Sequence, residues 1–71
     1  MTLIQSHSYT INLANVQYIR PHTHTDATIF KMTSNDHVKI TCPYDEVMKQ
    51  LKGSIDPMSG AIAKEVITLD Y

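Results

Sequence analysis

The sequence predicts a small α+β domain, an antiparallel β-meander packed by one α-helix, with a C-terminal strand or short helix. Short runs of aliphatic, Thr and Tyr residues recur with a period near two through residue 41. One amphipathic segment then lies between Pro43 and Gly53. The chain has 71 residues, of which 42% are hydrophobic. This length leaves room for one core, so we expect residues 1–71 to form a single domain.

Four strands are expected in a sheet over about residues 3–41. They cover roughly residues 3–7, 9–12 and 16–21, followed by a hairpin of 27–33 with 37–41. A single strand bent near Ser8 is the alternative to the first two, because Ser6-His7-Ser8 is a moderate turn signal.

Burial selects a register for the hairpin. Placing Phe30 opposite Ile40 and Met32 opposite Val38 puts four apolar side chains on one face. This register leaves residues 34–36, Ser-Asn-Asp, as a three-residue loop, and Asn or Asp tolerates the left-handed backbone of such loops. With the preceding strand, the predicted inner face contains Val16, Tyr18, Phe30, Met32, Val38 and Ile40.

The helix is expected over residues 43–52. Pro43 stands at the first helical position, acids occupy the first turn, lysines the last, and Gly53 follows. An apolar stripe of Val47, Met48 and Leu51 is predicted to cover the inner face of the sheet.

The C-terminal segment begins with an expected loop over residues 54–60, which contains Pro57 and Gly60. Residues 61–65 suit a helix, whereas residues 66–71 suit a strand. We favour a strand over the last half of 61–71, with Ile67, Leu69 and Tyr71 on one face.

The outward face of the hairpin carries the first candidate site. The predicted register places Lys31 opposite Lys39, which is unfavourable unless an anion or an acidic partner binds there. Arg20 joins the pair if its strand lies alongside, and His37 adds charge at mildly acidic pH. The alternative, which we favour from the sequence alone, is that the lysine stems extend into water and cover Ile29.

Residues 20–26, Arg-Pro-His-Thr-His-Thr-Asp, form the second candidate site. In an extended conformation His22, His24 and Asp26 alternate onto one side, where they are able to ligate a transition metal such as zinc. The alternative, which we favour, is a solvated polar loop. We therefore expect no cofactor.

Catalysis has little support in the sequence. The glycines are Gly53 and Gly60, so a glycine-rich phosphate loop and a Gly-x-Ser-x-Gly elbow are both absent. Cys42 stands where a helix N-terminus would lower its pKa, which suits a nucleophile. We favour a small residue that fills the corner between strand and helix, and a chain that is not an enzyme.

Charge and size bear on the partner. The net charge of −1 is far from the basic balance of proteins that bind nucleic acid through phosphates. The sequence contains neither an apolar run of membrane-spanning length nor a signal-peptide pattern, so we expect a cytoplasmic protein without a membrane partner. The lone Cys42 makes no internal disulfide, and one sheet with one helix leaves a face uncovered. We therefore expect a homo-oligomer, at least a dimer.

Two family resemblances cover roughly residues 9–52. The run Leu13-Ala14-Asn15-Val16-Gln17-Tyr18-Ile19 resembles the start of LytTR-type DNA-binding domains, a resemblance that implies DNA recognition. The Phe-x-Arg-x-His segment of that family does not follow Gly53. The spacing of Asn12, Val16 and Ile19, with Asp45-Glu46-Val47 in the helix, also resembles small flagellar proteins of the FlbD or SwrD type. That resemblance implies an accessory protein that acts through contacts.

The sequence thus predicts a small binding or regulatory module that contacts a protein partner or another copy of itself. The first alternative is a nucleic-acid-binding regulator that uses Lys31, Lys39 and Arg20. The second is a metal-binding protein that uses His22 and His24.

Overall fold

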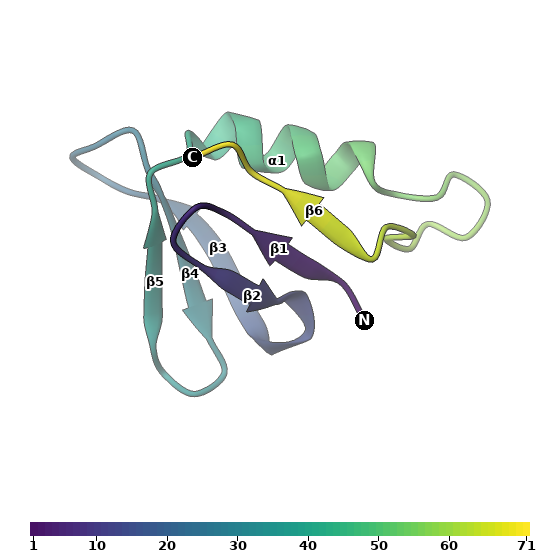
Figure 1. Cartoon of the computed structure of the whole chain (residues 1–71), viewed down its shortest axis with the longest axis horizontal. Helices are drawn as coiled ribbons and strands as arrows, with labels where there is room; N and C mark the ends of the chain where they lie inside the picture. Colours follow the sequence, from purple (N-terminus) through teal and green to yellow (C-terminus); the bar gives the residue numbers. More distant parts are fainter.

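A computed structural model describes all residues, 1–71, and confirms the α+β class. In chain order the elements are β1 (Leu3–Gln5), β2 (Thr10–Asn12), the 3-10 turn η1 (Leu13–Asn15), β3 (Val16–Pro21), β4 (Thr28–Met32), β5 (His37–Ile40), α1 (Tyr44–Gly53) and β6 (Val66–Thr68). Figure 1 shows α1 lying along one side of the molecule, with the strands below it.

The strands form two sheets, so the expectation of a single meander is wrong. One sheet has the order β2-β1-β6 and the other β3-β4-β5. β1 is antiparallel to β2 and parallel to β6, which places Ile4 between Ile11 and Ile67. This contact joins the two ends of the chain, and local periodicity carries no information about such a pairing.

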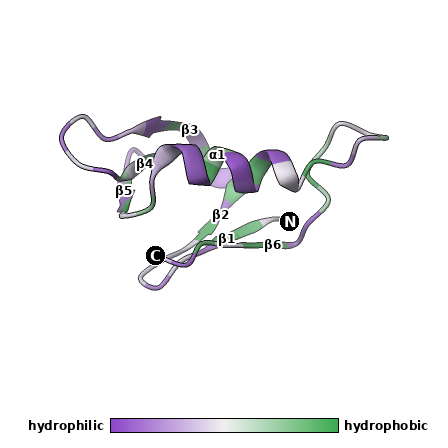
Figure 2. Ribbon diagram, turned by 90° about the horizontal axis from the view of Figure 1, so that it is seen from above, coloured by the Kyte–Doolittle hydropathy of each residue, from purple (hydrophilic) through white to green (hydrophobic).

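One core fills the space between the two sheets and the helix. Figure 2 shows hydrophobic residues along β1, β2 and β6 and hydrophilic bands on α1. Both sheets contribute side chains to this core, whereas the outward face of β3-β4-β5 stays uncovered, so the homo-oligomer remains a prediction. The buried cluster consists of Ile4, Ile11, Phe30, Ile40, Cys42, Val47, Ile67 and Leu69.

A buried hydrogen bond fixes the corner where β5 leads into α1. The hydroxyl of Thr28 donates to the carbonyl oxygen of Cys42 at 2.7 Å, and both residues are fully buried. A polar side chain is tolerated there because its hydrogen bond is made inside the protein.

The helix matches its prediction to within one residue at each end. Pro43 precedes α1 as its N-cap. At the C-terminus the Ser54 N–H donates a hydrogen bond to the carbonyl oxygens of Leu51 and Lys52. Val47 is buried, and Met48 and Leu51 pack against the core as expected.

The C-terminal segment forms a loop and then a strand, as favoured. An isolated bridge between Ile55 and Ile62 closes the loop, and residues 61–65 contain no helix. β6 buries Ile67, and Leu69 just beyond it is also buried, whereas Tyr71 is 43% exposed.

A β-bulge in β3 changes which side chains face the core. The pairing with β4 shifts between Val16 and Tyr18, so Gln17 is the extra residue. Tyr18 therefore points outward and is 45% exposed, and Ile19 packs against the core in its place. The prediction of an inward Tyr18 is wrong for this reason.

The hairpin of β4 and β5 keeps the predicted face but not the predicted register. Phe30 pairs with Val38 instead of Ile40, and Thr28 pairs with Ile40. The turn occupies residues 33–35, and Asn35 adopts the left-handed conformation with φ of 73°. Three-residue hairpin loops place a left-handed residue third, and Asn fills that position more readily than Asp36 would in the predicted loop.

Candidate functional site

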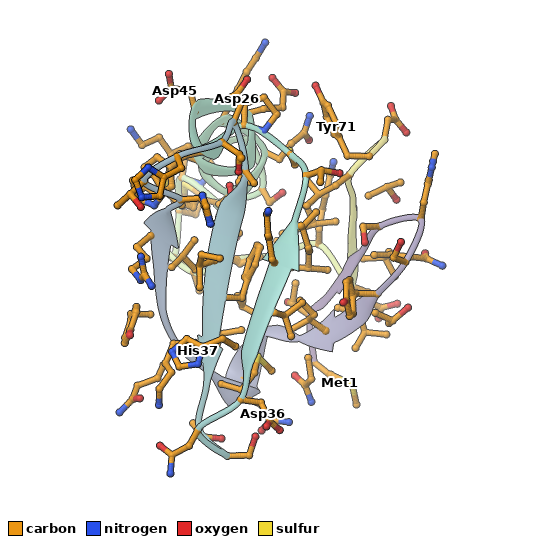
Figure 3. The ribbon with its side chains drawn as sticks, turned by 90° about the vertical axis from the view of Figure 1, so that its left-hand side faces the viewer. Met1, Asp26, Asp36, His37, Asp45 and Tyr71 are labelled. Atoms are coloured by element: carbon orange, nitrogen blue, oxygen red, sulfur yellow. The ribbon has the colours of Figure 1, made fainter.

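The candidate site is the outward face of the sheet β3-β4-β5, built from two rows of side chains. Across the three strands, Tyr18, Lys31 and His37 form one row. The second row contains Arg20, Ile29 and Lys39. We call these six residues the cationic face. Figure 3 looks toward this side of the molecule and places His37 on it.

The cations of this face are held at separate positions. Neighbouring strands lie about 4.8 Å apart, so about 10 Å separates the backbones of Arg20 and Lys39 on the two outer strands. Both side chains are exposed. Ile29 lies between them and is only 7% exposed, which makes it the apolar centre of the row.

Lys31 is fixed by neutral acceptors. Its Nζ donates to Asn35 Oδ1 at 2.9 Å, to Gln17 Oε1 at 3.2 Å and to the Met32 carbonyl at 3.5 Å. None of these partners carries a negative charge, so the ammonium group remains an uncompensated cation. The bulge residue Gln17 thus also helps to position the lysine.

The predicted Lys31–Lys39 pair does not exist. Lys39 faces Ile29, and Lys31 faces His37. The two lysines are diagonal neighbours in adjacent rows, so the direct repulsion expected of an opposed pair is avoided.

Negative charge is excluded from the three strands, which contain no Asp or Glu. Asp36 stands between the β4-β5 turn and β5, and its carboxylate accepts a hydrogen bond from the Ser34 hydroxyl at 3.1 Å. Asp26 and Asp45 lie at the opposite end of the molecule from Asp36 (Figure 3). The face is therefore positive in a chain whose net charge is −1.

The histidine segment continues the face beyond β3. His22 pairs with Ala27 through an N–H to carbonyl bond of 2.9 Å, and residues 23–26 then bend instead of extending. The extended conformation that would bring His22, His24 and Asp26 onto one side is therefore not adopted. The rings of His22 and His24 are 6.2 Å apart, and the structure contains no cluster of three or more His, Cys, Asp or Glu able to hold a metal ion.

The ring of His22 is engaged by its own turn. Nδ1 accepts from the His24 N–H at 3.2 Å, from the Thr25 N–H at 3.2 Å and lies 3.1 Å from the Thr25 hydroxyl oxygen. Desolvation lowers the pKa of His22, and the charges of Lys39, His24 and Arg20 lower it further. Sequence patterns gave no sign of this contact.

Cys42 fills the corner between β5 and α1. The side chain is fully buried, and its Sγ lies 3.6 Å from the Pro43 carbonyl oxygen. Desolvation raises the pKa of the thiol, and the carboxylates of Glu46 and Asp26 raise it further. A protonated, buried thiol suits packing and is a poor nucleophile.

The concave features of the surface are small. A groove of about 260 Å³ runs between α1 and β6, lined by Glu46, Gln50, Thr68, Leu69, Asp70 and Tyr71. A second, of about 220 Å³, lies beside Lys39 and Tyr71. Pockets for small molecules usually exceed about 300 Å³, so a flat surface is the stronger candidate site.

Comparison with protein-family models, curated proteins and solved structures finds no match for this chain. The resemblances to LytTR-type domains and to small flagellar proteins therefore stay predictions. The single α-helix, of ten residues, falls short of the length and apolar character required to cross a membrane.

Proposed function

We propose that this protein is a small non-enzymatic binding module that receives an acidic segment of a protein partner on its cationic face. The observation that carries the proposal is the placement of Arg20, Lys31 and Lys39 on three adjacent strands that lack any carboxylate. Such an arrangement steers an acidic partner and sets its orientation.

The spacing of the face favours an extended acidic peptide. Alternate residues of an extended chain lie about 7 Å apart, which equals the distance between successive rows along a β-strand. Glutamates at alternate positions of a bound segment would meet the row of Lys31 and then the row of Arg20 and Lys39. The exposed Tyr18 supplies apolar contact beside these charges.

Single-stranded nucleic acid is the second candidate. Tyr18 is 45% exposed and shares a row with Lys31 and His37, an arrangement able to stack a base beside a phosphate contact. Only three permanent cations belong to the face, however, and the whole chain is slightly acidic. A short acidic peptide requires fewer cationic contacts than an extended polyphosphate.

A binding measurement with matched variants tests the proposal. A fluorescently labelled peptide of alternating Glu and Ser is titrated with the protein near neutral pH and at low salt, with a Gln-Ser peptide as the neutral control. The double variant Arg20→Gln, Lys39→Gln should lose about tenfold in affinity, equivalent to about 1.4 kcal/mol. The double variant Lys49→Gln, Lys64→Gln makes the same change in net charge away from the face, and its affinity should stay within about twofold.

Equal losses in the two double variants would show a general charge effect and overturn the proposal. The same titration with a single-stranded oligonucleotide separates the two candidates. Tighter binding of the oligonucleotide, lost on Tyr18→Ala, would favour the nucleic-acid function instead.

A further inference from the structure

The turn that follows β3 contains two successive backbone N–H groups that point at a single acceptor. His24 N–H and Thr25 N–H both donate to Nδ1 of His22, each at 3.2 Å, and the Thr25 hydroxyl lies within 3.1 Å of the same atom. Successive N–H groups that converge in this way form a concave site of the kind that binds anions in many proteins. Here the site is occupied by the lone pair of the protein's own imidazole.

This contact depends on the protonation state of His22. Nδ1 accepts only while it carries no proton, so the neutral ring holds its hydrogen on Nε2. Protonation adds a hydrogen to Nδ1 and turns the acceptor into a donor. The two N–H groups then face another donor, and the imidazole must leave the turn.

The charges that lower the pKa of His22 are all positive or potentially positive. Arg20 precedes it on β3, Lys39 acts on it from β5, and His24 stands within the turn. Asp26 is the carboxylate of the same loop, and it raises the pKa of Cys42. Once the ring is protonated, the turn presents two N–H groups and a hydroxyl beside an imidazolium, a guanidinium and an ammonium group.

We propose that residues 22–25 form an oxyanion site that opens when His22 is protonated, with the anion taking the place of Nδ1 on the His24 and Thr25 N–H groups. This inference rests on the proposed function, because the site lies at the end of the cationic face beside Arg20. A carboxylate of the bound acidic segment would anchor there, so mild acid would strengthen binding at this point. The neutral His22 side chain thereby closes the site, and the protonated side chain is a cation that helps to hold the anion.

Sulfate is the probe, because it keeps two negative charges from about pH 5 to about pH 8, the range over which histidine titrates. Uniformly ¹⁵N-labelled protein is titrated with sodium sulfate at both pH values, against sodium chloride of equal ionic strength. At about pH 5 sulfate should shift the amide signals of His24 and Thr25, with an affinity about tenfold tighter than at about pH 8.

Three variants tie the effect to the ring. His22→Ala removes the occupant, so sulfate should shift the same amides equally at both pH values. His22→Asn supplies an oxygen that accepts the backbone N–H two residues on and does not titrate, so the site should stay closed at both pH values. His7→Ala alters an exposed histidine between β1 and β2, outside the cationic face, and it should keep the pH dependence of the native protein.

Unshifted His24 and Thr25 amides in acid, or an affinity independent of pH in the native protein, would overturn the inference. So would loss of the pH dependence in His7→Ala. The sulfate titration needs no partner, which separates its failure from that of the proposed function. If the acidic peptide binds with the same affinity at both pH values, the binding module is supported and the acid-opened site is not. If sulfate binds in acid and the peptide does not bind, the acid-opened site is supported and the binding module is not.

Discussion

Lys39 lies directly opposite Ile29, two residues along β5 from the His37 that faces Lys31. This pairing keeps the two lysines in different rows and leaves an apolar side chain between Lys39 and Arg20. The arrangement gives each cation its own position and provides a nearly buried apolar floor between two of them. A face built in this way can bind separate carboxylates and does not need an anion to relieve repulsion between lysines.

Lys31 contributes to stability, whereas Lys39 does not. Lys31→Gln removes the hydrogen bonds from Nζ to Gln17 and Asn35, so we expect the free energy of unfolding to fall by about 0.5–1 kcal/mol. Lys39→Gln should change it by less than about 0.5 kcal/mol, because the side chain is exposed. Urea denaturation of both variants measures the difference. A gain in stability for Lys31→Gln would indicate that the lysines repel each other after all.

The left-handed conformation of Asn35 predicts an ordering of variants at this position. Asn35→Gly keeps the backbone at φ of 73° without strain and loses only the contact with Lys31. Asn35→Ala loses the same contact and also forces an alanine into the left-handed region, at a cost of about 1 kcal/mol. The Asn35→Ala variant should therefore have a lower melting temperature than the Asn35→Gly variant in thermal denaturation. Equal melting temperatures would contradict the turn at residues 33–35.

Stability should fall in mild acid because of His22. Its pKa is lowered in the folded chain by desolvation and then by Lys39, His24 and Arg20, so the unfolded chain binds the proton at a higher pH than the folded chain does. The contribution of His22 to the free energy of unfolding is therefore complete above its unfolded pKa of about 6.5. It is lost as the pH falls through the lower pKa of the folded chain. His22→Asn should reduce the fall in melting temperature between about pH 7 and about pH 5. An unchanged pH profile in that variant would show that His22 is not the responsible group.

Zinc should leave the melting temperature unchanged. Nδ1 of His22 already accepts from the turn and its proton sits on Nε2, so neither nitrogen offers a free lone pair without rearrangement. Differential scanning fluorimetry with and without zinc measures this. A zinc site on the folded chain would add about 2.7 kcal/mol at a hundredfold excess over its dissociation constant. A rise in melting temperature that vanishes on His22→Ala, His24→Ala would restore the metal-binding alternative.

Local sequence signals predicted the individual strands and the helix, whereas the pairing between distant segments was missed. Pro43 and Gly53 mark the ends of the helix to within one residue, because capping depends on neighbouring residues alone. The pairing of Ile4 with Ile67 depends on the whole fold, so the second sheet could not be inferred from a period of two.

The candidate site was predicted in its residues but not in its layout. Arg20, Lys31, His37 and Lys39 were chosen correctly as residues of one outward face, and Tyr18 was assigned to the core because the bulge at Gln17 has no sequence signature. The requirement for a left-handed third residue in the turn would have selected Asn35 and hence the observed register. The bend at residues 23–26, by contrast, brings the His24 and Thr25 N–H groups onto the His22 ring, a contact that no spacing rule anticipates.

Mapping where an acidic peptide binds tests directly whether the cationic face is the binding surface. Uniformly ¹⁵N-labelled protein is titrated with the Glu-Ser peptide, and the amide shift changes are located on the fold. We expect the largest changes on β3, β4 and β5, centred on Arg20, Ile29 and Lys31. Changes that fall instead on the groove between α1 and β6 would contradict binding at the cationic face. So would a Glu-Ser peptide that produces no more change than the neutral Gln-Ser peptide.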